Sequence, residues 1–296
     1  MANIIDGLSI ARAIESEATS GAHQLRAAGL APHLVTIQVG PAAATDVYIQ
    51  NQKRRFAEMG IQFTHLDLDA GVDEETVANH VQDLNDNPKV TGIMIALPLP
   101  AAINPNRIQE RILPAKDVEG VSPSNLGNLI LNRGTIGPCT AIAVLEAIHS
   151  TRVPTEGAHA VMVGHSHIVG MPVTLCLLRD LATTTTCHIA TRDLAAETSR
   201  ADILIVAVGK PGLIAGDMVK PGAVVIDVGI NRVKDPTRGT GSTRLVGDVV
   251  FPEVSKVAGW ITPVPGGIGP VTVAVLARNV VYCARGLLEQ QQAGDR

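Results

Sequence analysis

A glycine-bounded segment in the second half of the chain has the composition of a nucleotide-binding loop. Residues 164–170 read Gly-His-Ser-His-Ile-Val-Gly; they directly follow the apolar run 158–163, and a helix is expected from about Met171. A helix N-terminus exposes unpaired N–H groups and partial positive charge, which suit a pyrophosphate, and glycine lets the backbone approach such a ligand closely. The spacing is not GxGxxG, so this segment alone is equally compatible with an ordinary strand-to-helix turn.

The end of the next expected strand bears on the choice of cofactor. NAD sites usually place an acidic residue there to bind the ribose 2′-hydroxyl. Here residues 188–192 read His-Ile-Ala-Thr-Arg, and a hydroxyl and a cation suit a 2′-phosphate better. The sequence therefore favours NADP over NAD, with Arg192 as the candidate ligand. Asp193 lies close by, and Arg192 is equally compatible with a solvated surface charge.

Two further loops follow apolar runs and are expected at the same edge of a parallel sheet. They read Val-Gly-Lys-Pro-Gly at 208–212 and Asp-Val-Gly-Ile-Asn at 227–231. Ligands of doubly wound sheets bind outside the carboxyl ends of the strands, so both loops would face one crevice, although each alone could be only a turn. His165 and His167 have no convergent acidic or cysteine partners in the sequence, so no metal site is predicted.

Parallel strands are needed to position these loops, and the apolar runs supply two series of them. The first series comprises strands at 34–39, 63–68 and 92–97, with helices at 46–59 and 74–85. The second comprises strands at 158–164, 184–189, 203–208, 224–228 and 259–264. This βαβ rhythm predicts an α/β protein of two domains: an N-terminal α/β catalytic domain and a Rossmann-like, doubly wound parallel-sheet domain.

The expected boundary lies near residues 137–140, after a loop-like stretch at 128–137. We assign 1–137 to the first domain, completed by the C-terminal helix within 271–296, and 138–270 to the second, NADP-binding domain. Residues 234–243 are expected to form a surface hairpin or loop.

Composition restricts the class of protein. Of the 296 residues, 46 % are hydrophobic but only 2 % aromatic, which suits parallel strands of aliphatic residues. The net charge of −4 without a long basic run argues against nucleic acid or an anionic membrane as partner. The four cysteines form no CxxC pair, and the N-terminus lacks the pattern of a signal peptide. No apolar run reaches about 18 residues. We therefore expect a soluble, cytoplasmic protein.

Short motifs run almost from end to end of the chain. They are Ile-Ile-Asp-Gly at 4–7, Leu-Pro-Leu-Pro at 97–100, Lys-Asp-Val-Glu-Gly at 116–120, Pro-Cys-Thr at 138–140, the loops at 164–170, 206–212 and 225–231, Gly-Asp-Val at 247–249 and Thr-Pro-Val-Pro-Gly-Gly-Ile-Gly-Pro at 262–270. Together they resemble the bifunctional 5,10-methylenetetrahydrofolate dehydrogenase/cyclohydrolase family.

The resemblance implies two reactions. The family oxidises 5,10-methylenetetrahydrofolate with NAD(P)+ and then hydrolyses the methenyl product to 10-formyltetrahydrofolate. It implies a folate site in which Tyr48 stacks on the substrate and Asp117 lies beside the pterin, accompanied by Ala96, Leu97, Pro98, Pro263, Gly266 and Gly267. It implies a cofactor site with Thr140, Gly164, His165, Ser166, Ile168, Gly170, Arg192, Gly209 and Ile230, and a homodimer joined through the second domain.

Some of these residues have plainer interpretations. Tyr48 could be a half-buried core side chain, and Asp117 a turn or capping residue. The 262–270 string could act only through its backbone conformation.

The chain departs from the family at three positions of the folate site. The family has Tyr, three residues and then Lys, but here Gln52 follows Tyr48 at that spacing. On a helix, Lys53 and Arg54 point about 100° and 200° away from Gln52, so neither takes over its position. The family's Gln before Leu-Pro-Leu-Pro is here Ala96, and the second acid of the Lys-Asp-Val-Asp-Gly motif is here Glu119.

These exchanges affect the two reactions unequally. Hydride transfer needs the carbon held against the cofactor and no enzymic base. Hydrolysis needs a titratable group to deprotonate water, and glutamine cannot serve. We therefore expect an NADP-dependent dehydrogenase whose cyclohydrolase activity is weak or lost, with Tyr48, Gln52, Asp117 and Glu119 in the catalytic pocket. The alternatives are an oxidoreductase of the same fold acting on another pterin or a specialised-pathway substrate, and a non-catalytic binding homologue.

Overall fold

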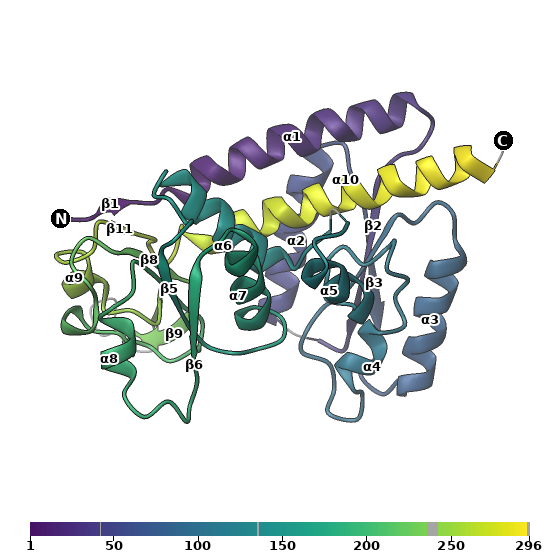
Figure 1. Cartoon of the computed structure of the whole chain (residues 1–296). Coiled ribbons are helices and arrows are strands. Elements are labelled where there is room, and N and C mark those ends of the chain that lie inside the picture. Colours follow the sequence, from purple (N-terminus) through teal and green to yellow (C-terminus); the bar gives the residue numbers. More distant parts are fainter. Residues whose placement is uncertain (42, 135, 236–241, 295–296) are drawn as a thin grey trace. The chain divides into compact units, whose positions relative to one another are not determined.

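The computed structural model describes residues 1–41, 43–134, 136–235 and 242–294, with the side chains of 43–48 and 294 left out (Figure 1). The chain divides into two compact units. Unit 1 consists of Met1–Arg12 and Thr140–Thr272, and unit 2 of Ala13–Cys139 and Val273–Arg296. Two long helices, α1 (Gly7–Ala27) and α10 (Ile268–Gly294), contribute residues to both units.

Unit 1 is built on a six-stranded sheet in which every neighbouring pair is parallel. The strand order is β1 (Asn3–Ile4), β11 (Trp260–Ile261), β8 (Val224–Asp227), β7 (Ile203–Val206), β5 (His159–Val163) and β6 (Thr183–Cys187). The predicted parallel sheet is confirmed. Several strands end earlier than expected, so His188 and Ile189 lie in the loop beyond β6 and not on the strand.

The direction of winding reverses at β5. From β5 the chain passes to β6 on one side and then to β7 on the other, and it continues outward to β8. The crevice beside the carboxyl ends of β5 and β7 is therefore the topological switch point, where doubly wound sheets bind their ligands. The helices of this unit are α6 (Cys139–Ser150), α7 (Gly170–Arg179), α8 (Leu194–Thr198) and α9 (Phe251–Val254), with a 3-10 turn, η1, at Gly216–Met218.

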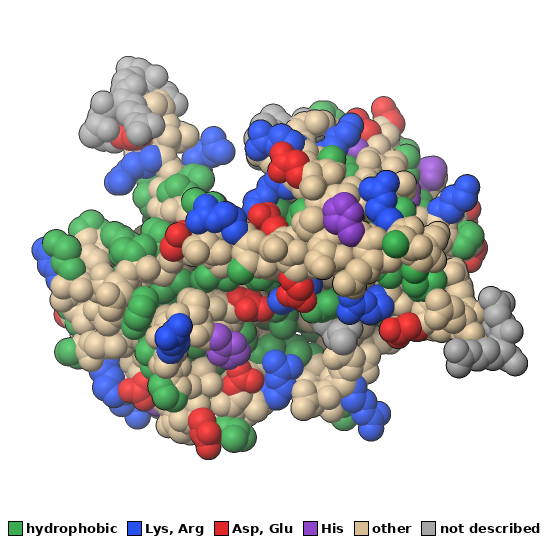
Figure 2. Space-filling view, turned by 90° about the horizontal axis from the view of Figure 1, so that it is seen from above, with side chains coloured by type: hydrophobic (Ala, Val, Ile, Leu, Met, Phe, Trp, Pro, Cys, Tyr) green, Lys and Arg blue, Asp and Glu red, His purple; other side chains and the backbone are tan. Residues whose placement is uncertain are grey.

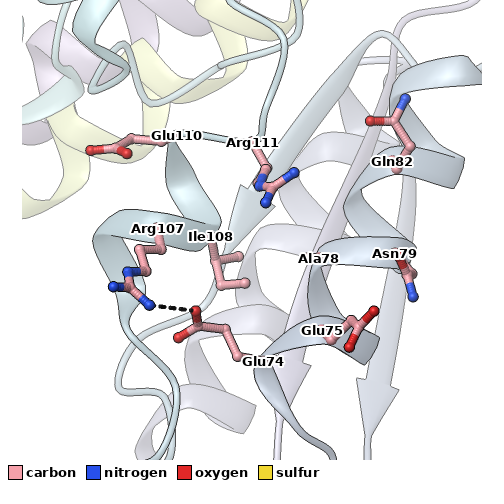
Figure 3. Close-up of a pocket in the computed structure, with 9 residues that line it drawn as sticks. All are labelled: Glu74, Glu75, Ala78, Asn79, Gln82, Arg107, Ile108, Glu110 and Arg111. Atoms are coloured by element: carbon pink, nitrogen blue, oxygen red, sulfur yellow. Dashed lines mark hydrogen bonds and ion pairs between the residues drawn. The ribbon is translucent and has the colours of Figure 1, made fainter.

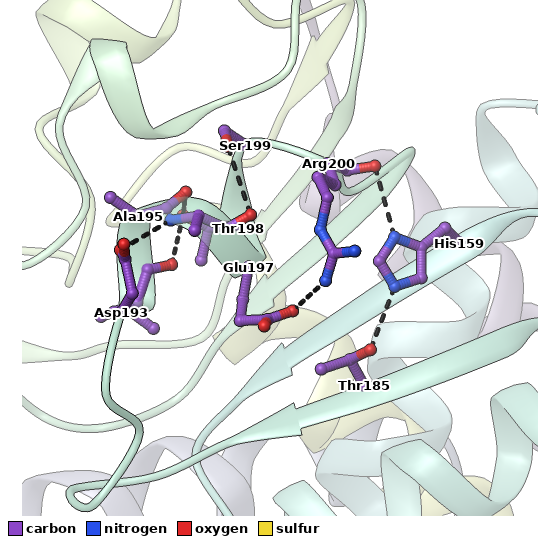
Figure 4. Close-up of polar contacts among 10 residues, drawn as sticks. His159, Thr185, Asp193, Ala195, Glu197, Thr198, Ser199 and Arg200 are labelled. Atoms are coloured by element: carbon purple, nitrogen blue, oxygen red, sulfur yellow. Dashed lines mark hydrogen bonds and ion pairs between the residues drawn. The ribbon is translucent and has the colours of Figure 1, made fainter.

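A polar cluster fixes the opposite, amino-terminal end of these strands. The ring of His159 on β5 lies within hydrogen-bond distance of the Arg200 carbonyl at 3.3 Å and the Thr185 hydroxyl on β6 at 3.0 Å (Figure 4).

Asp193 caps α8 by accepting from the N–H of Ala196 at 2.9 Å. Asp193 is therefore engaged at the start of a helix, next to the exposed Arg192.

The N-terminal segment clusters differently from the sequence-based division. Met1–Arg12 belongs to unit 1, whereas we assigned it to the first domain. The reason is β1, which pairs in parallel with β11 through Asn3 and Trp260. Two strands flank the region of the expected surface hairpin: β9 (Asn231–Lys234) and β10 (Thr243–Val246). They pair antiparallel. Residues 236–241, between them, lie outside the described residues.

Unit 2 contains a three-stranded parallel sheet in the order β3 (Gln62–Leu68), β2 (His33–Val39) and β4 (Gly92–Ile95). Its other helices are α2 (Ala43–Glu58), α3 (Glu74–Asp86), α4 (Pro105–Gln109) and α5 (Pro123–Ile130). The central strand β2 is buried along almost its whole length, as expected for a strand covered on both faces. Aliphatic side chains of β2, β4 and α3 form one core cluster, including Ile37, Val77 and Ile93.

Helix α10 is the one helix within the described residues that is long and apolar enough to cross a membrane, over Ile268–Ala293. In its apolar window 56 % of the residues are buried inside the protein, and a mostly buried core helix passes the same test of length and composition. Charged side chains of both signs are intermixed over the face shown in Figure 2.

Candidate active site

Gln52, one of the residues predicted for the folate site, is almost completely buried. It lies on α2 and is 1 % exposed, while the neighbouring Lys53 and Arg54 are exposed, as their helical spacing predicted. Neither its Oε1 nor its Nε2 has a hydrogen-bond partner among the described residues. A buried amide left unpaired costs about 1–3 kcal/mol. Tyr48 also lies within α2, but its side chain is not among those described.

Asp117 is committed to its own loop. It is 2 % exposed; its Oδ1 accepts from the N–H of Gly120 at 3.0 Å, and its Oδ2 accepts from the N–H of Ser122 at 2.7 Å and the amide of Asn125 at 2.9 Å. A carboxylate with these three donors organises the loop that leads into α5. This geometry favours the turn role over direct substrate contact for Asp117.

Glu119 is an ionisable group of this region whose pKa is strongly raised by its surroundings. Burial and the nearby negative charge of Asp117 raise its pKa to about 8, against a lowering effect of a backbone hydrogen bond at Ile95. That hydrogen bond places the carboxyl at the end of β4, next to Ala96, which is 6 % exposed. The longer acid therefore lies beside the position where the side chain is shortened. Leu97 and Pro98 follow as exposed residues joined by a cis peptide bond.

A buried lysine is present nearby but is occupied elsewhere. Lys116 is 3 % exposed, and its Nζ donates to the carbonyls of Leu84, Asn85 and Asn87 at 2.9, 2.6 and 2.8 Å. These carbonyls belong to the end of α3, whose partial negative charge favours an ammonium group. Desolvation lowers the pKa of Lys116. This lysine caps the end of α3.

Unit 1 has a cavity of about 760 Å³ outside the carboxyl ends of β5, β6 and β7. It is lined by Val163, Gly164, His165, Ser166, His167, Met171, His188, Ile189, Thr191, Leu194, Ala207, Val208, Lys210 and Leu213. No acidic residue is among them, and Lys210 and three histidines are. This composition suits a ligand that carries phosphate groups and does not suit the ribose of NAD, which an acid usually binds.

Close approach of the backbone explains the glycine at the start of this loop. Gly164 has φ of +119°, and a Cβ there would lie 2.4 Å from the carbonyl oxygen of Ala207 on the neighbouring strand's loop. Only glycine avoids both the strain and the collision. Ser166 uses its Oγ to accept from the N–H of Val169 at 3.2 Å and of Gly170 at 3.4 Å, so it caps α7.

The predicted cofactor residues fall into three groups. Gly164, His165 and Ser166 line the cavity. Ile168 and Gly209 are exposed in the same two loops without lining it, and Thr140 is half-buried at the start of α6. Arg192 is exposed and does not line the cavity; Thr191 and His188 do. The rings of His165 and His188 pack edge to face, with centroids 5.4 Å apart.

A smaller cavity of about 140 Å³ in the same unit brings together the 227–230 loop and the 263–270 string. Pro263, Gly266 and Gly267 line it with Ile230, which is 64 % exposed. The second cis peptide bond, Val264–Pro265, lies in this string.

Two buried carboxylates, Asp227 and Asp248, hold these loops together, a role that was not predicted for them from the sequence. Asp248 accepts from the N–H groups of Val208 and Gly209 at 2.8 and 2.9 Å and from the Asn231 amide at 2.8 Å. Asp227 accepts from the N–H groups of Gly229, Asp248 and Val249 at 2.9–3.0 Å. The signal was present in the motifs 225–231 and 247–249, whose acids follow apolar runs.

Asp227 and Asp248 lie very close to each other's loops. A Cβ at Gly247 would lie 1.8 Å from Asp227 Oδ2, which explains the glycine of the Gly-Asp-Val motif. Burial raises the pKa of Asp227 to about 6, although its three backbone hydrogen bonds lower it. The pair thus links the loops after β7 and β8, which contribute to both cavities.

Another hollow lies elsewhere, between α3 and the segment that contains α4. Its volume is about 820 Å³, and Figure 3 shows charged side chains of both signs along it, with Arg107 paired to Glu74 at 3.5 Å. It shares no residue with the predicted site positions, and its surface is open and mixed in charge. In the part of the chain that the structure covers, no group of three His, Cys, Asp or Glu side chains could hold a metal ion.

Comparison with known families and proteins gives consistent matches over the whole chain. Residues 5–119 match the catalytic domain of tetrahydrofolate dehydrogenase/cyclohydrolase, and residues 138–287 match the NAD(P)-binding domain of the same family. The chain is 45 % identical to the bifunctional protein FolD of Moorella thermoacetica over 284 residues, which is 96 % of this chain and 99 % of that protein.

Solved structures agree with this. The bifunctional FolD methylenetetrahydrofolate dehydrogenase/cyclohydrolase of Campylobacter jejuni superposes with a TM-score of 0.92 at 37 % identity, covering 97 % of this chain and 99 % of that one. The Trypanosoma brucei methylenetetrahydrofolate dehydrogenase-cyclohydrolase, solved with NADP and an inhibitor, gives 0.90 at 38 % identity, with coverages of 96 % and 98 %.

The carboxylate pair gives the first testable prediction. Asp248→Ala leaves three donors unpaired and is expected to lower the free energy of unfolding by about 1–3 kcal/mol. Asp248→Asn should cost clearly less, because the amide oxygen still accepts from Val208 and Gly209 and Asn231 can turn its own amide. Urea unfolding measures both, with Asn231→Ala as the control that removes one partner. Equal losses for the Ala and Asn variants would contradict this account.

Proposed function

The chain belongs to the tetrahydrofolate dehydrogenase/cyclohydrolase family, and from that premise we propose that it oxidises 5,10-methylenetetrahydrofolate to 5,10-methenyltetrahydrofolate with NADP while its cyclohydrolase activity is weak or lost. The observation that carries the second half of the proposal is Gln52. It is buried on α2 without a partner among the described side chains, where the family's motif has an ionisable lysine.

The cofactor cavity of unit 1 fits NADP. Its lining holds Lys210 and three histidines and no acid, and the glycine at position 164 permits close approach of a pyrophosphate. When bound, NADP supplies the acceptor for the hydride. The chain's own part is to hold and orient it: Gly164, His165, Ser166, Ile168 and Gly170 from the first loop, with Thr140, Arg192, Gly209 and Ile230, form the proposed contact set. Asp227 and Asp248 position the loops that carry Gly209 and Ile230.

The folate side of the site is formed by residues of α2 and of the segments after β4. We assign stacking on the substrate to Tyr48, hydrogen bonding to Gln52, and the pterin's amino and ring N–H groups to Glu119. Ala96, Leu97 and Pro98 shape the wall, and Asp117 holds the loop that presents Glu119. From the family resemblance, we also assign Pro263, Gly266 and Gly267 to substrate binding. Gln52 can donate and accept, so it can orient a substrate without exchanging protons.

Ring opening of the methenyl product is helped by a general base, which these side chains supply poorly at neutral pH. Water must lose a proton as it adds to the methenyl carbon, and general base help is typically worth roughly 10²–10⁴-fold. Gln52 has no titratable group, and Lys116 is tied to three carbonyls. Glu119, with its pKa raised to about 8, is mostly protonated at neutral pH and so is not a base there.

The proposal also covers the domain bounds of the chain, its oligomeric state and its location in the cell. We infer a folate domain of residues 1–137 with the helix in 271–296, an NADP domain of 138–270, a homodimer formed through the second domain, and a cytoplasmic location. Two features support the homodimer. β6 is an outermost strand of its sheet, with one edge unpaired. Leu178 on α7 and Leu181 just after this helix are both exposed.

The direct test is to mix the protein with methylenetetrahydrofolate and NADP+ and to follow NADPH, methenyl and formyl products separately. We expect NADPH to form while methenyltetrahydrofolate accumulates and decays at the uncatalysed rate. Rapid formyl production would refute the loss of cyclohydrolase activity. Tight NADP binding without turnover would favour another substrate, and no binding of either ligand would favour a non-catalytic homologue.

Restoring the amine should restore ring opening. Gln52→Lys is expected to raise cyclohydrolase activity by roughly 10²-fold or more, because it returns a group that can exchange protons. Gln50→Lys, which adds a lysine at an exposed position of the same helix, is the matched control and should leave the rate unchanged. Retained dehydrogenase activity shows that each variant is folded. If Gln52→Lys gains nothing, Gln52→Lys with Ala96→Gln tests whether the second exchange also matters.

The raised pKa of Glu119 predicts a pH dependence of substrate binding. Below pH 8 the carboxyl is mostly protonated and cannot accept two N–H donors, so KM for the folate at saturating NADP should fall as pH rises. Between pH 6.5 and 9 the fall should be about 30-fold if only the ionised form binds. Glu119→Gln cannot ionise and should give a flat profile. A wild-type KM that does not change over this range would disprove the assigned contact.

A further inference from the structure

Asn279 is a buried polar side chain of α10 that lies outside the proposed contact sets for folate and cofactor. It is 2 % exposed, and its Nδ2 donates to the carbonyls of Val118 at 2.9 Å and Gly137 at 3.1 Å and lies 3.4 Å from Sγ of Cys139. Carbonyl oxygens only accept, so the amide nitrogen must face them, and its two hydrogens can serve both. Asn279 therefore joins the 117–120 loop to the segment before α6.

These contacts belong to a set that holds the backbone on both sides of Glu119. The carbonyl before it, that of Val118, also accepts from Sγ of Cys139 at 3.4 Å, and its own carbonyl accepts from the N–H of Cys139 at 3.3 Å. The N–H after it, that of Gly120, donates to Oδ1 of Asp117 at 3.0 Å. Because peptide groups are planar and both of those that flank Glu119 are held, the direction in which its side chain leaves the backbone is fixed.

The loop and the segment before α6 meet through backbone atoms. Gly120 has φ of +68°, and a Cβ there would lie 2.5 Å from the carbonyl carbon of Gly137, so only glycine fits at this position. The Asn279 amide ties the two stretches together at this contact. Without it, two buried carbonyls lose a donor, and the loop that carries Glu119 is free to separate from its support.

The ionisable groups near Glu119 do not hold its carboxyl in place by opposite charge. Asp117, in the same loop, is a like charge, and with burial it raises the pKa of Glu119 to about 8. Burial also raises the pKa of the thiols of Cys139 and of Cys283 on α10, so both are uncharged near neutral pH. The ammonium of Lys116 is bound to the carbonyls at the end of α3. The orientation of Glu119 therefore depends on how its backbone is held.

We propose that Asn279 is a positioning residue that, through the carbonyls of Val118 and Gly137, holds Glu119 in the orientation that binds the pterin. The inference rests on the proposed contact between Glu119 and the folate. Asn279 is 161 positions from Val118 in the chain, so the C-terminal helix contributes to folate binding without contacting the folate. The pterin's amino and ring N–H groups take no part in hydride transfer, so loss of this support weakens binding and leaves the chemical step nearly unchanged.

The first readout is steady-state kinetics at saturating NADP and pH 9, where Glu119 is ionised. Asn279→Ala should raise KM for the folate about tenfold, the worth of one hydrogen-bonded contact to a charged group, with kcat changed less than about twofold. In a Glu119→Ala protein the same substitution should leave KM within about twofold, because no carboxyl remains to be positioned. Asn279→Ser keeps one small donor and should give a lesser rise in KM.

The second readout needs no turnover. In protein labelled with ¹³C at the glutamate carboxyls, the NMR signal of Glu119 is identified by its absence from Glu119→Ala. Its titration midpoint, expected at a pH of about 8 in the wild-type protein, should fall by roughly half a pH unit or more in Asn279→Ala. The reason is that a released loop admits water to the carboxyl and reduces its desolvation.

Val281→Ala is the matched control on the same helix. Val281 is 2 % exposed and faces α1, where a Cβ at Gly21 would lie 2.7 Å from its Cγ1. This variant should lower the free energy of unfolding but leave KM and the titration midpoint of Glu119 unchanged.

Three results would overturn the inference: an equal rise in KM with and without Glu119, a midpoint that does not move in Asn279→Ala, or equal shifts in Val281→Ala. Absence of turnover in the wild-type protein would overturn the proposed function, and the midpoint of Glu119 would then decide alone for or against the positioning role of Asn279.

Discussion

Two buried carboxylates hold the cofactor edge of the six-stranded sheet in shape. Asp227 is 3 % and Asp248 0 % exposed, and together they accept five backbone N–H bonds and the Asn231 amide. Two such acids in one place repel each other and are desolvated, and the donors of three loops offset this. The loops after β7 and β8 and the Gly-Asp-Val segment therefore have one arrangement, and the walls of both cavities in unit 1 follow from it.

The folate-site motifs show a consistent redistribution of chemistry. A titratable side chain is absent at Gln52, a side chain is shortened at Ala96, and an acid is lengthened beside it at Glu119. In the function we propose, Glu119 binds the pterin and Gln52 orients it, while the amide of Gln52 cannot exchange protons near neutral pH. Binding and proton transfer would then depend on different side chains.

The sequence predicted the parallel sheets and that Lys53 and Arg54 point away from the side of α2 that carries Gln52, since these follow from periodicity and helical geometry. It did not predict that β1 joins the six-stranded sheet, because a two-residue strand leaves no periodic pattern. It also offered Arg192 for the cofactor; Arg192 itself does not line the cavity, and its neighbours His188 and Thr191 do. Which side of a loop a residue faces cannot be read from its position in the chain.

The sequence by itself determined the family, the fold class and the absence of a lysine at position 52, because each is a matter of residue types at fixed spacing. Only the tertiary structure decided what the remaining ionisable groups do. Lys116 became a helix cap, Asp117 a loop organiser, and Glu119 an acid with a pKa of about 8. Their roles depend on desolvation and on neighbours distant in the chain, such as Leu84 for Lys116, and these exist only in the folded protein.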